Sequence, residues 1–234
     1  MRDVRMAAVL FDLDDTLYPE LTFVHGGLRA AADRLGRRTG QARERLFERM
    51  VAIHEADGRG RIFDTLVAEI AAQDPVLVPL LIFAYRSHEP RIAVFDDVAP
   101  VLAALRNAGI RLGLVTDGLA SVQRRKVEAL GLDELVDVVV PTSELGPGVD
   151  KRSPIGHLVA LDILGVPPSA ATYVGNDPRK DFVGARAAGM STIRVRDMPH
   201  EGGPPIPRES WPDDADRYLE HFADLTGLID ESVP

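Results

Sequence analysis

Acidic, amide and hydroxyl side chains come directly after three apolar runs of this sequence. They are Asp12, Asp14, Asp15 and Thr16 after residues 6–11, Thr116 and Asp117 after residues 110–115, and Asn176, Asp177 and Asp181 after residues 170–174. Carboxylates crowded together raise one another's pKa unless a cation lies among them. The chain has no cysteine, and no histidine falls in these segments, so oxygen atoms must hold such a cation. We expect Mg2+, a hard ion that prefers oxygen ligands.

The elements that must position these side chains follow from the apolar runs themselves. Continuous runs of this length are typical of parallel strands that are buried on both faces. Five of them, at residues 6–11, 110–115, 135–140, 170–174 and 192–195, alternate with helical patterns at 98–108, 119–130, 155–164 and 181–188, each followed closely by a glycine. This alternation predicts an α/β fold, a Rossmann-like parallel sheet with helices on both faces. Such sheets bind ligands beyond the carboxyl ends of their strands.

Residues 17–94 break the alternation. They show one helical pattern after another, with no buried-strand run between them. We interpret residues 17–94 as an all-helical cap domain, inserted into an α/β core that comprises residues 1–16 and 95–234. Near the end of the chain, the apolar stripe of residues 218–228 predicts a short closing helix.

Composition excludes several classes of function. The 234 residues carry a formal charge of −9, which gives no overall attraction to nucleic acid or to anionic lipid. No apolar stretch reaches the roughly 18–20 residues of a membrane span, and the first residues do not read as a signal peptide. We therefore expect a cytoplasmic protein that binds neither nucleic acid nor membrane. Its only lysines are Lys126, Lys151 and Lys180, so chemistry that needs an amine has few candidates.

Four segments in order carry a resemblance to a known family. The segment from Asp12 to Leu17, Asp-Leu-Asp-Asp-Thr-Leu, resembles the DxDxT signature of the haloacid dehalogenase (HAD) superfamily. The apolar run that ends in Thr116 is similar to the second motif of that family, and Lys151 stands where the third has its lysine. The segment 175–177, together with Asp181, is similar to the acidic fourth motif. The resemblance implies that the inserted segment is a C1-type helical cap.

The resemblance also implies a role for each matching residue. Asp12 would be the nucleophile that forms an aspartyl-phosphate, and Asp14 the acid that protonates the leaving oxygen and then activates water. Thr116 and the backbone amides of Asp117 and Gly118 would bind phosphate, and Lys151 would supply positive charge. Mg2+ would be held by Asp12, by the backbone carbonyl of Asp14 and by an acid of the fourth motif. Independently, two acids two residues apart point to the same side of an extended chain, which suits acid–base work.

Two positions depart from the family pattern. Lys151 is followed by Arg152 where the family usually has proline, and Asn176 follows glycine where the family usually has aspartate. We therefore expect Asp177 to be the direct metal ligand and Asn176 to act through water. Asp181 is expected to cap the following helix or to orient Lys151 or a metal-bound water. Dehalogenases lack an acid two residues after the nucleophile, so Asp14 favours the phosphatase branch.

The function predicted from these features is a Mg2+-dependent phosphatase for a small phosphomonoester, a sugar phosphate or a nucleotide. One alternative is a phosphotransferase similar to β-phosphoglucomutase, because that enzyme shares the nucleophile and the type of cap. A second is a non-enzymatic protein, either a receiver-like module or a scaffold. Motif order argues against a receiver, because receivers carry the phosphorylated aspartate at the third strand and have no insertion after the first.

The inserted segment offers candidates for substrate contact, namely Tyr18, Phe23, His25, Arg29, Arg86, His88 and Arg91. His25 and Arg29 are four residues apart and share a helix face. The expected partner is a small phosphorylated metabolite, and the expected assembly is a monomer or weak homodimer.

Overall fold

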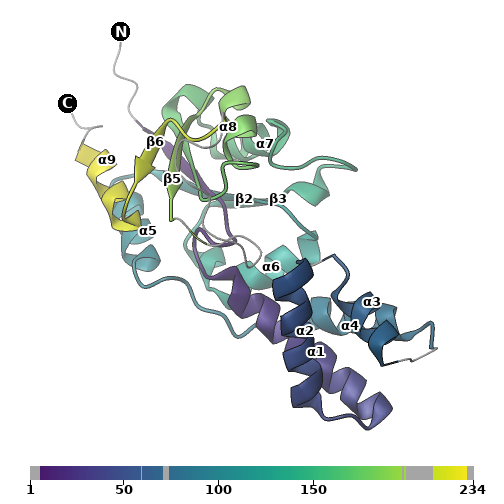
Figure 1. Ribbon diagram of the computed structural model, residues 1–234. Coiled ribbons are helices and arrows are strands. Elements are labelled where there is room, and N and C mark those ends of the chain that lie inside the picture. Colours follow the sequence, from purple (N-terminus) through teal and green to yellow (C-terminus); the bar gives the residue numbers. More distant parts are fainter. Residues whose placement is uncertain (1–5, 59, 71–73, 197, 199–212, 231–234) are drawn as a thin grey trace. The chain divides into compact units, whose positions relative to one another are not determined.

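Strand β1 (Ala8–Phe11) has neighbours on both sides in a parallel sheet (Figure 1). The computed structural model describes residues 6–58, 60–70, 74–196, 198 and 213–230. Within them the sheet has the order β3-β2-β1-β4-β5-β6. Its further strands are β2 (Arg111–Thr116), β3 (Val138–Pro141), β4 (Ala171–Gly175), β5 (Ser191–Val195) and β6 (Arg217–Leu219). Phe11 pairs with both Leu114 and Val174, so the chain segments that follow β1, β2 and β4 meet at one edge.

Helices cover both faces of this sheet, as the sequence predicts. They are α5 (Val98–Asn107), α6 (Ala120–Ala129), α7 (Ile155–Leu164) and α8 (Phe182–Ala188), each within one residue of its predicted ends. On one face, Leu10, Tyr173 and Phe182 belong to a buried cluster with residues of α7. On the other face, Phe222 lies beside α5 and its ring centroid is 5.9 Å from that of Phe11. The predicted Rossmann-like α/β fold is therefore confirmed.

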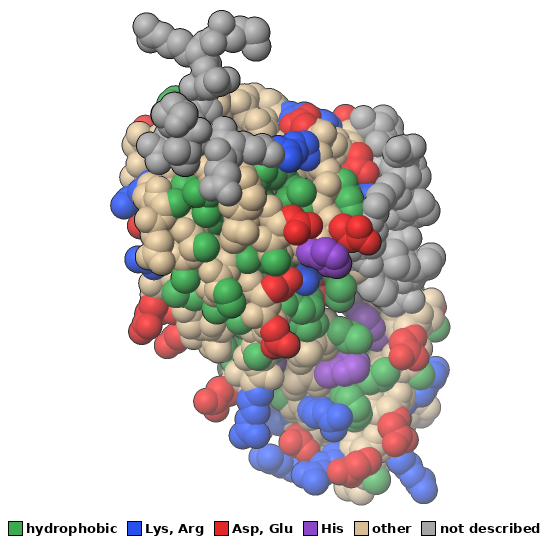
Figure 2. Space-filling view, turned by 90° about the vertical axis from the view of Figure 1, so that its left-hand side faces the viewer, with side chains coloured by type: hydrophobic (Ala, Val, Ile, Leu, Met, Phe, Trp, Pro, Cys, Tyr) green, Lys and Arg blue, Asp and Glu red, His purple; other side chains and the backbone are tan. Residues whose placement is uncertain are grey.

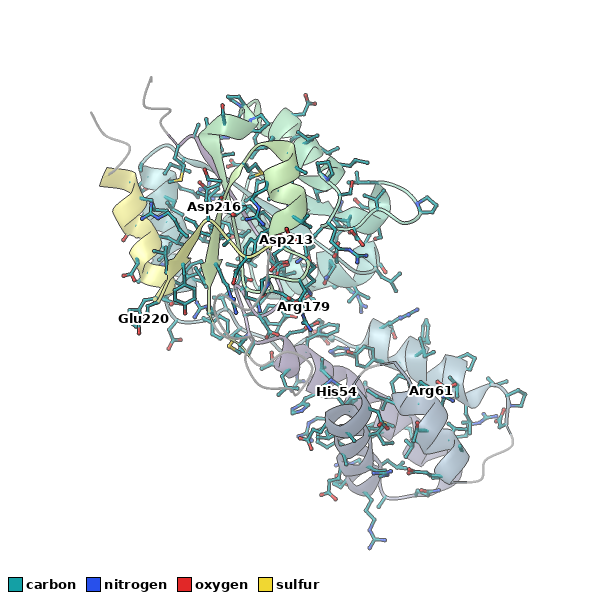
Figure 3. The ribbon with its side chains drawn as sticks, turned by 45° about the horizontal axis from the view of Figure 1, so that its top comes forward. His54, Arg61, Arg179, Asp213, Asp216 and Glu220 are labelled. Atoms are coloured by element: carbon teal, nitrogen blue, oxygen red, sulfur yellow. The ribbon has the colours of Figure 1, made fainter. Side chains whose placement is uncertain are left out.

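The prediction of a closing helix over residues 218–228 is wrong in its first half. Tyr218 lies in β6, which pairs with β5, and a 3-10 segment (Phe222–Thr226) and α9 (Gly227–Asp230) come only afterwards. The backbone N–H and the hydroxyl of Thr192 both donate to the carboxylate of Asp216 at 2.8 Å; Asp216 is labelled in Figure 3. These hydrogen bonds anchor the chain beside β5, where it forms an edge strand. The helical segments begin only after this strand. The third strand also starts later than predicted, at Val138 rather than Leu135.

The chain divides into two compact units. The second unit is Glu20–Arg91, and the described residues on either side of it form the first, which contains the sheet. The sequence placed these boundaries three residues away, after residue 16 and before residue 95. The second unit consists of α1 (Glu20–Thr39), α2 (Arg43–Asp57), α3 (Ile62–Glu69) and α4 (Leu77–Ser87).

The helical unit has an apolar core of its own. Leu28, Leu35, Met50 and Leu81 are among its fully buried side chains. Gly27 lets α1 and α4 approach closely, because a Cβ atom there would be 2.5 Å from the Tyr85 ring. Among the helices of the described residues, none has the length and apolar character needed to cross a membrane.

Candidate active site

Asp12 is the first residue after β1, and its side chain is only 2% exposed. Its backbone N–H donates to the carbonyl of Val174 at 2.9 Å, which continues the strand pairing up to the site. Lys151 Nζ donates to Asp12 Oδ1 at 2.5 Å, and Thr16 Oγ1 donates to Asp12 Oδ2 at 3.2 Å. Burial raises the pKa of Asp12 to about 7, although Lys151 works in the opposite direction. One ammonium group therefore compensates this buried carboxylate only in part.

Lys151 is shared between two carboxylates. Its Nζ also donates to Asp181 Oδ1 at 2.5 Å, and both the lysine and Asp181 are almost fully buried. Burial alone would lower the pKa of Lys151, but Asp12 and Asp181 raise it well above its usual value. The lysine is therefore a fixed cation. Gly184 permits this arrangement, because a Cβ atom there would lie 2.1 Å from the carbonyl oxygen of Lys151.

Asp181 organises the loop after β4 as well as Lys151. Its Oδ2 atom accepts hydrogen bonds from the backbone N–H groups of Asn176 at 3.0 Å and Asp177 at 2.8 Å. Gly175 is needed beneath it, since a Cβ atom there would be 2.6 Å from Asp181 Oδ2. Of the roles the sequence left open, the contacts of Asp181 match that of orienting Lys151.

The Asp14 carboxylate is bonded by three donors. Tyr18 Oη and Lys126 Nζ donate to Oδ1 at 2.5 and 2.7 Å, and Gln123 Nε2 donates to Oδ2 at 3.1 Å. Burial alone would raise the pKa of Asp14, but Lys126 and these hydrogen bonds lower it to about 2. The neighbouring Asp15 has a φ of 59°, so the backbone turns sharply here. Asp14 is thus held as a carboxylate beside Asp12.

Lys126 and Gln123 were not among the site residues predicted from the sequence. Both project from α6, three residues apart, and both are buried. The only sequence signal was the scarcity of lysine. Tyr18, which the sequence assigned to the inserted segment as a candidate for substrate contact, belongs to the first unit, and its hydroxyl donates to Asp14.

The loop after β2 is built around Thr116 and Asp117. Thr116 is 1% exposed, and its hydroxyl accepts a hydrogen bond from Gln123 Nε2 at 3.0 Å. Asp117 Oδ1 accepts from the Thr142 hydroxyl at 2.7 Å and from the backbone N–H of Lys151 at 2.9 Å. The Asp117 side chain therefore ties this loop to the segment that carries Lys151. Gly118 continues the turn with a φ of 119°.

The structure places the two neighbouring residues of the fourth motif differently. Asn176 Oδ1 accepts from Thr16 Oγ1 at 3.3 Å, the same hydroxyl that contacts Asp12 Oδ2. Asp177 accepts two hydrogen bonds at 2.9 Å from the Arg179 guanidinium (Figure 3) and one at 3.0 Å from the Arg179 backbone N–H. Arg179 outweighs the effect of burial and lowers the pKa of Asp177 to about 2. The amide of Asn176, not the carboxylate of Asp177, shares a contact with Asp12.

The oxygen atoms around Thr16 fit a hard cation. A hydroxyl has one proton, so Asp12 Oδ2 and Asn176 Oδ1 compete for a single donor. In the part of the chain that is described, no three His, Asp or Glu side chains form a metal-binding group. A site here would therefore combine one carboxylate with amide and backbone carbonyl oxygens, all of them ligands that Mg2+ accepts.

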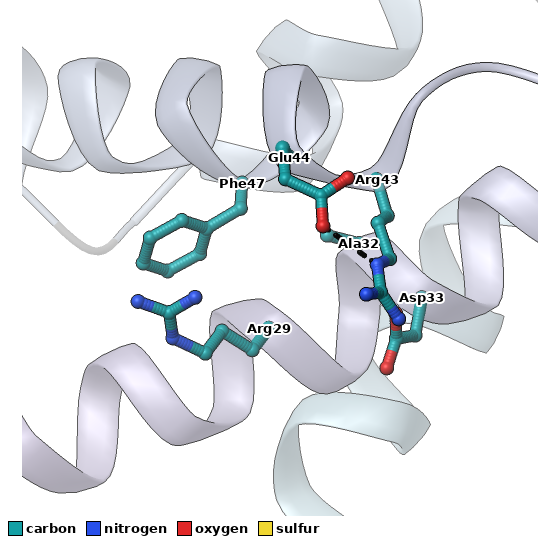
Figure 4. Close-up of a pocket in the computed structure, with 6 residues that line it drawn as sticks. All are labelled: Arg29, Ala32, Asp33, Arg43, Glu44 and Phe47. Atoms are coloured by element: carbon teal, nitrogen blue, oxygen red, sulfur yellow. Dashed lines mark hydrogen bonds and ion pairs between the residues drawn. The ribbon is translucent and has the colours of Figure 1, made fainter.

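The remaining candidates lie in the helical unit. Phe23 is buried, and its ring centroid is 4.6 Å from that of His88. The Arg29 guanidinium lies 4.0 Å from the centre of the Phe47 ring, and His25 meets the same ring edge-on. Arg29 and Phe47 line a pocket of about 250 Å³ between α1 and α2, together with Ala32, Asp33, Arg43 and Glu44 (Figure 4). Arg86 and Arg91 are exposed.

Comparison with known proteins assigns the family. Residues 6–189 match the haloacid dehalogenase-like hydrolases. The chain belongs to this family. It is 36% identical to a glyceraldehyde 3-phosphate phosphatase of Methanopyrus kandleri, a match that covers 88% of this chain and 91% of that protein. It is 30% identical to a phosphoserine phosphatase of Thermus thermophilus, with 81% of this chain and 88% of that protein covered.

Among solved structures, the chain resembles a 2-haloacid dehalogenase of Pseudomonas syringae pv. Tomato. The TM-score is 0.66 at 25% identity, and the match covers 97% of this chain and all of the other. This HAD-like hydrolase thus shares its architecture with a dehalogenase, whereas the two relatives that are 36% and 30% identical are phosphatases. The predicted membership of the superfamily and of its phosphatase branch is confirmed.

Proposed function

We propose that this HAD-like hydrolase hydrolyses a small phosphomonoester through an aspartyl-phosphate on Asp12, with Mg2+ as cofactor. The observation that carries the proposal is the buried pairing of Asp12 with Lys151 at 2.5 Å, with the Asp14 carboxylate two residues away. A carboxylate held in this way is a nucleophile with a neighbouring acid–base group, which is the arrangement needed for two-step phosphoryl transfer to water.

In the first step, Asp12 attacks phosphorus and the bond to the leaving oxygen breaks. The proton that this oxygen needs comes from Asp14. Because Asp14 starts as a carboxylate, it must first take up a proton, and an anionic phosphate arriving beside it raises its pKa and favours that uptake. Lys151, fixed by Asp181, stabilises the charge that develops on the transferring group.

In the second step, water attacks the phosphorus of the aspartyl-phosphate. Asp14, now a carboxylate again, accepts the proton of that water, and the bond from phosphorus to Asp12 breaks. Inorganic phosphate leaves and Asp12 is restored. The Thr116 hydroxyl and the backbone amides of the turn at Asp117 and Gly118 supply donors for the phosphate oxygens through both steps.

The residues proposed to hold Mg2+ are Asp12, the backbone carbonyl of Asp14 and Asn176. When bound, the ion screens the repulsion between the carboxylates and the phosphate. The contacts of Thr16 support this assignment, because Asp12 Oδ2 and Asn176 Oδ1 lie around one hydroxyl that has a single proton to donate. We assign Asp177 to the structure of the loop, since Arg179 binds both of its oxygens. We assign Asp181 to the support of Lys151.

The names of two relatives support a proposal for the substrate class. Glyceraldehyde 3-phosphate and phosphoserine, named for two of them, are both phosphomonoesters of three-carbon molecules. We propose a substrate of this size rather than a nucleotide. Arg29, whose guanidinium lies 4.0 Å from the centre of the Phe47 ring in the helical unit, remains a candidate for substrate contact.

The proposal is tested by measuring phosphate release from a panel of phosphomonoesters. The panel contains glyceraldehyde 3-phosphate, phosphoserine, a hexose phosphate and a nucleoside monophosphate, each with Mg2+. We expect turnover that is fastest for the three-carbon substrates and absent in Asp12→Asn. Equal phosphate release by wild type and Asp12→Asn would contradict the proposal. Transfer of phosphate to a second sugar hydroxyl, with no release of inorganic phosphate, would favour a phosphotransferase instead.

A further inference from the structure

All three lysines of this chain contact aspartates of the loops that form the site, although arginine supplies 24 of the 27 basic residues. Lys151 binds Asp12, Lys180 Nζ lies 3.9 Å from Asp177, and Lys126 binds Asp14. The Lys126 side chain is 4% exposed and that of Asp14 is 15% exposed. A lysine presents one compact ammonium group, whereas arginine presents a wide planar fork. Lysine thus suits a narrow, buried contact with one carboxylate oxygen.

The surroundings of Lys126 join the predicted acid to the predicted phosphate loop. Gln123, one helical turn before Lys126 on α6, has three acceptors around its side-chain amide nitrogen: Asp14 Oδ2 at 3.1 Å, the Thr116 hydroxyl at 3.0 Å and the backbone carbonyl of Asp117. Tyr18 donates to the same Asp14 oxygen as Lys126, and the lysine Nζ lies 5.9 Å from the centre of the tyrosine ring. One face of α6 therefore fixes the distance between Asp14 and the residue that binds phosphate.

We propose that Lys126 is a positioning residue, which holds the Asp14 carboxyl where it can deliver a proton to the leaving oxygen. The proposal rests on the function proposed above. Lys126 acts through Asp14 and does not touch the phosphorylated substrate. The proton passes from Asp14 to the leaving oxygen as the bond from phosphorus to that oxygen breaks, and Lys126 gains and loses nothing. Proton transfer requires the donor within hydrogen-bond reach of the acceptor, and small misplacements of reacting groups are costly.

Stability alone is a weak reason for this buried pair. Replacing a buried ion pair by well-packed apolar residues is often neutral or even stabilising, because both charges must lose their water. The pair therefore requires another explanation, and its connection to Thr116 through Gln123 supplies one. A lysine with a purely structural role would not need to form its ion pair with the carboxylate that is proposed to transfer protons.

The dependence of activity on the leaving group separates positioning from structural support. An alkyl phosphate such as phosphoserine expels a poor leaving group that needs a proton, whereas p-nitrophenyl phosphate expels a stable phenolate that hardly needs one. The measured quantity is kcat/KM, which reports the steps up to formation of the aspartyl-phosphate. In Lys126→Met we expect it to fall about 100-fold for phosphoserine, at the lower end of losses for acid catalysis, and several-fold less for p-nitrophenyl phosphate.

Matched variants control for charge and folding. Arg125→Met removes one positive charge from the neighbouring position of α6 and is expected to leave both kcat/KM values close to wild type. Lys126→Gln keeps a donor of similar reach without the charge, and it should show the same selective loss in milder form. Thermal unfolding followed by circular dichroism verifies that each variant is folded at the assay temperature.

Equal losses on the two substrates in Lys126→Met would overturn the proposal, as would no loss at all. If Lys126→Met does not fold, Lys126→Gln decides: a selective loss supports positioning, and an equal loss on both substrates refutes it. Failure of the proposed function gives a different result, because wild type itself would then release no phosphate from either substrate.

Discussion

The two units of this protein differ in their buried charge: among the described residues both have exposed ion pairs, such as Arg124–Glu144 in the first unit, but the first unit also has buried ones. In the first unit, Asp12, Lys151 and Asp181 are at most 2% exposed and bind one another. In the helical unit, the ion pairs are at the surface, as in Arg49–Glu69, whose side chains are 48% and 37% exposed. Figure 2 shows side chains of both signs on the surface. Buried charges are costly and need a reason, whereas exposed pairs cost and contribute little, so the buried set marks the chemistry.

The net charges differ as well. Residues 20–91 contain 11 basic and 10 acidic side chains, whereas the rest of the chain contains 16 basic and 26 acidic ones. The unit that is proposed to bind an anionic substrate is therefore the strongly acidic one. It can do so only where positive charge is fixed locally, by Lys151 and by the proposed Mg2+.

The largest expected effect comes from Asp12→Asn in the first unit. A carboxamide cannot act as the nucleophile, and losing a nucleophile costs about 10⁴–10⁶-fold in kcat. Phosphate release from phosphoserine measures the effect. Asp74→Asn is the matched change in the helical unit, where Asp74 pairs with Arg38 at the surface, and it should leave kcat unchanged. A similar loss in both variants would mean that the buried set has no special role.

The second-largest expected effect is the loss of activity when the metal is removed. We expect EDTA to abolish phosphate release and Mg2+ to restore it. If Asn176 is a ligand, Asn176→Ala should raise the Mg2+ concentration for half-maximal activity about tenfold or more. Asp177→Asn should change that concentration much less, because Asp177 is bound to Arg179. The reverse order in a Mg2+ titration of the two variants would restore Asp177 as the ligand.

These predictions depend on contacts between side chains, and the sequence indicated only some of the residues that make them. Asp12, Thr116 and Asn176 were candidates from the sequence because each follows a buried strand, and parallel strands bring their ends to one edge. Lys126 and Gln123 were missed because they lie within a helix. From the sequence alone, a buried polar side chain of a helix cannot be distinguished from one on its solvent-exposed face. The choice between Asn176 and Asp177 as the proposed metal ligand depends on which of them binds the Arg179 guanidinium. The spacing of residues in the sequence does not reveal that contact.

Most of the fold, but not all of it, was also predictable from the sequence. Apolar runs gave five strands and the helices between them, since burial on both faces leaves a continuous signal. Strand β6 was missed because it is three residues long at the sheet edge. It pairs with β5 and is anchored by the hydrogen bonds between Thr192 and Asp216, and a contact between polar groups has no periodic signature.

A smaller effect concerns stability against pH. His157 is buried in the first unit against Tyr173, with ring centroids 4.7 Å apart, and burial lowers its pKa from 6.5 to about 4. The unfolded chain therefore binds a proton between about pH 6.5 and 4 that the folded chain does not. The contribution of His157 to stability must therefore fall as the pH drops through this range, by about 3 kcal/mol in all.

We expect His157→Phe to remove this part of the pH dependence. Urea unfolding at pH 7 and pH 4.5 measures it for wild type and variant. His25→Phe is the matched change in the helical unit, where the histidine is only half-buried and burial lowers its pKa less, so its effect should be smaller. An unchanged pH slope in His157→Phe would show that His157 is not buried as a neutral ring.

The smallest effect is expected for a surface ion pair of the helical unit. Arg49 donates to both carboxylate oxygens of Glu69, yet both side chains are well exposed. Water and salt screen such a pair, and ordering two long side chains offsets most of its attraction. Arg49→Gln should therefore shift Tm by no more than about 2 °C, and the shift should vanish at high salt. Thermal unfolding with and without added salt measures both. A shift that is large and insensitive to salt would show that charge in the helical unit is as tightly coupled to structure as it is around Asp12.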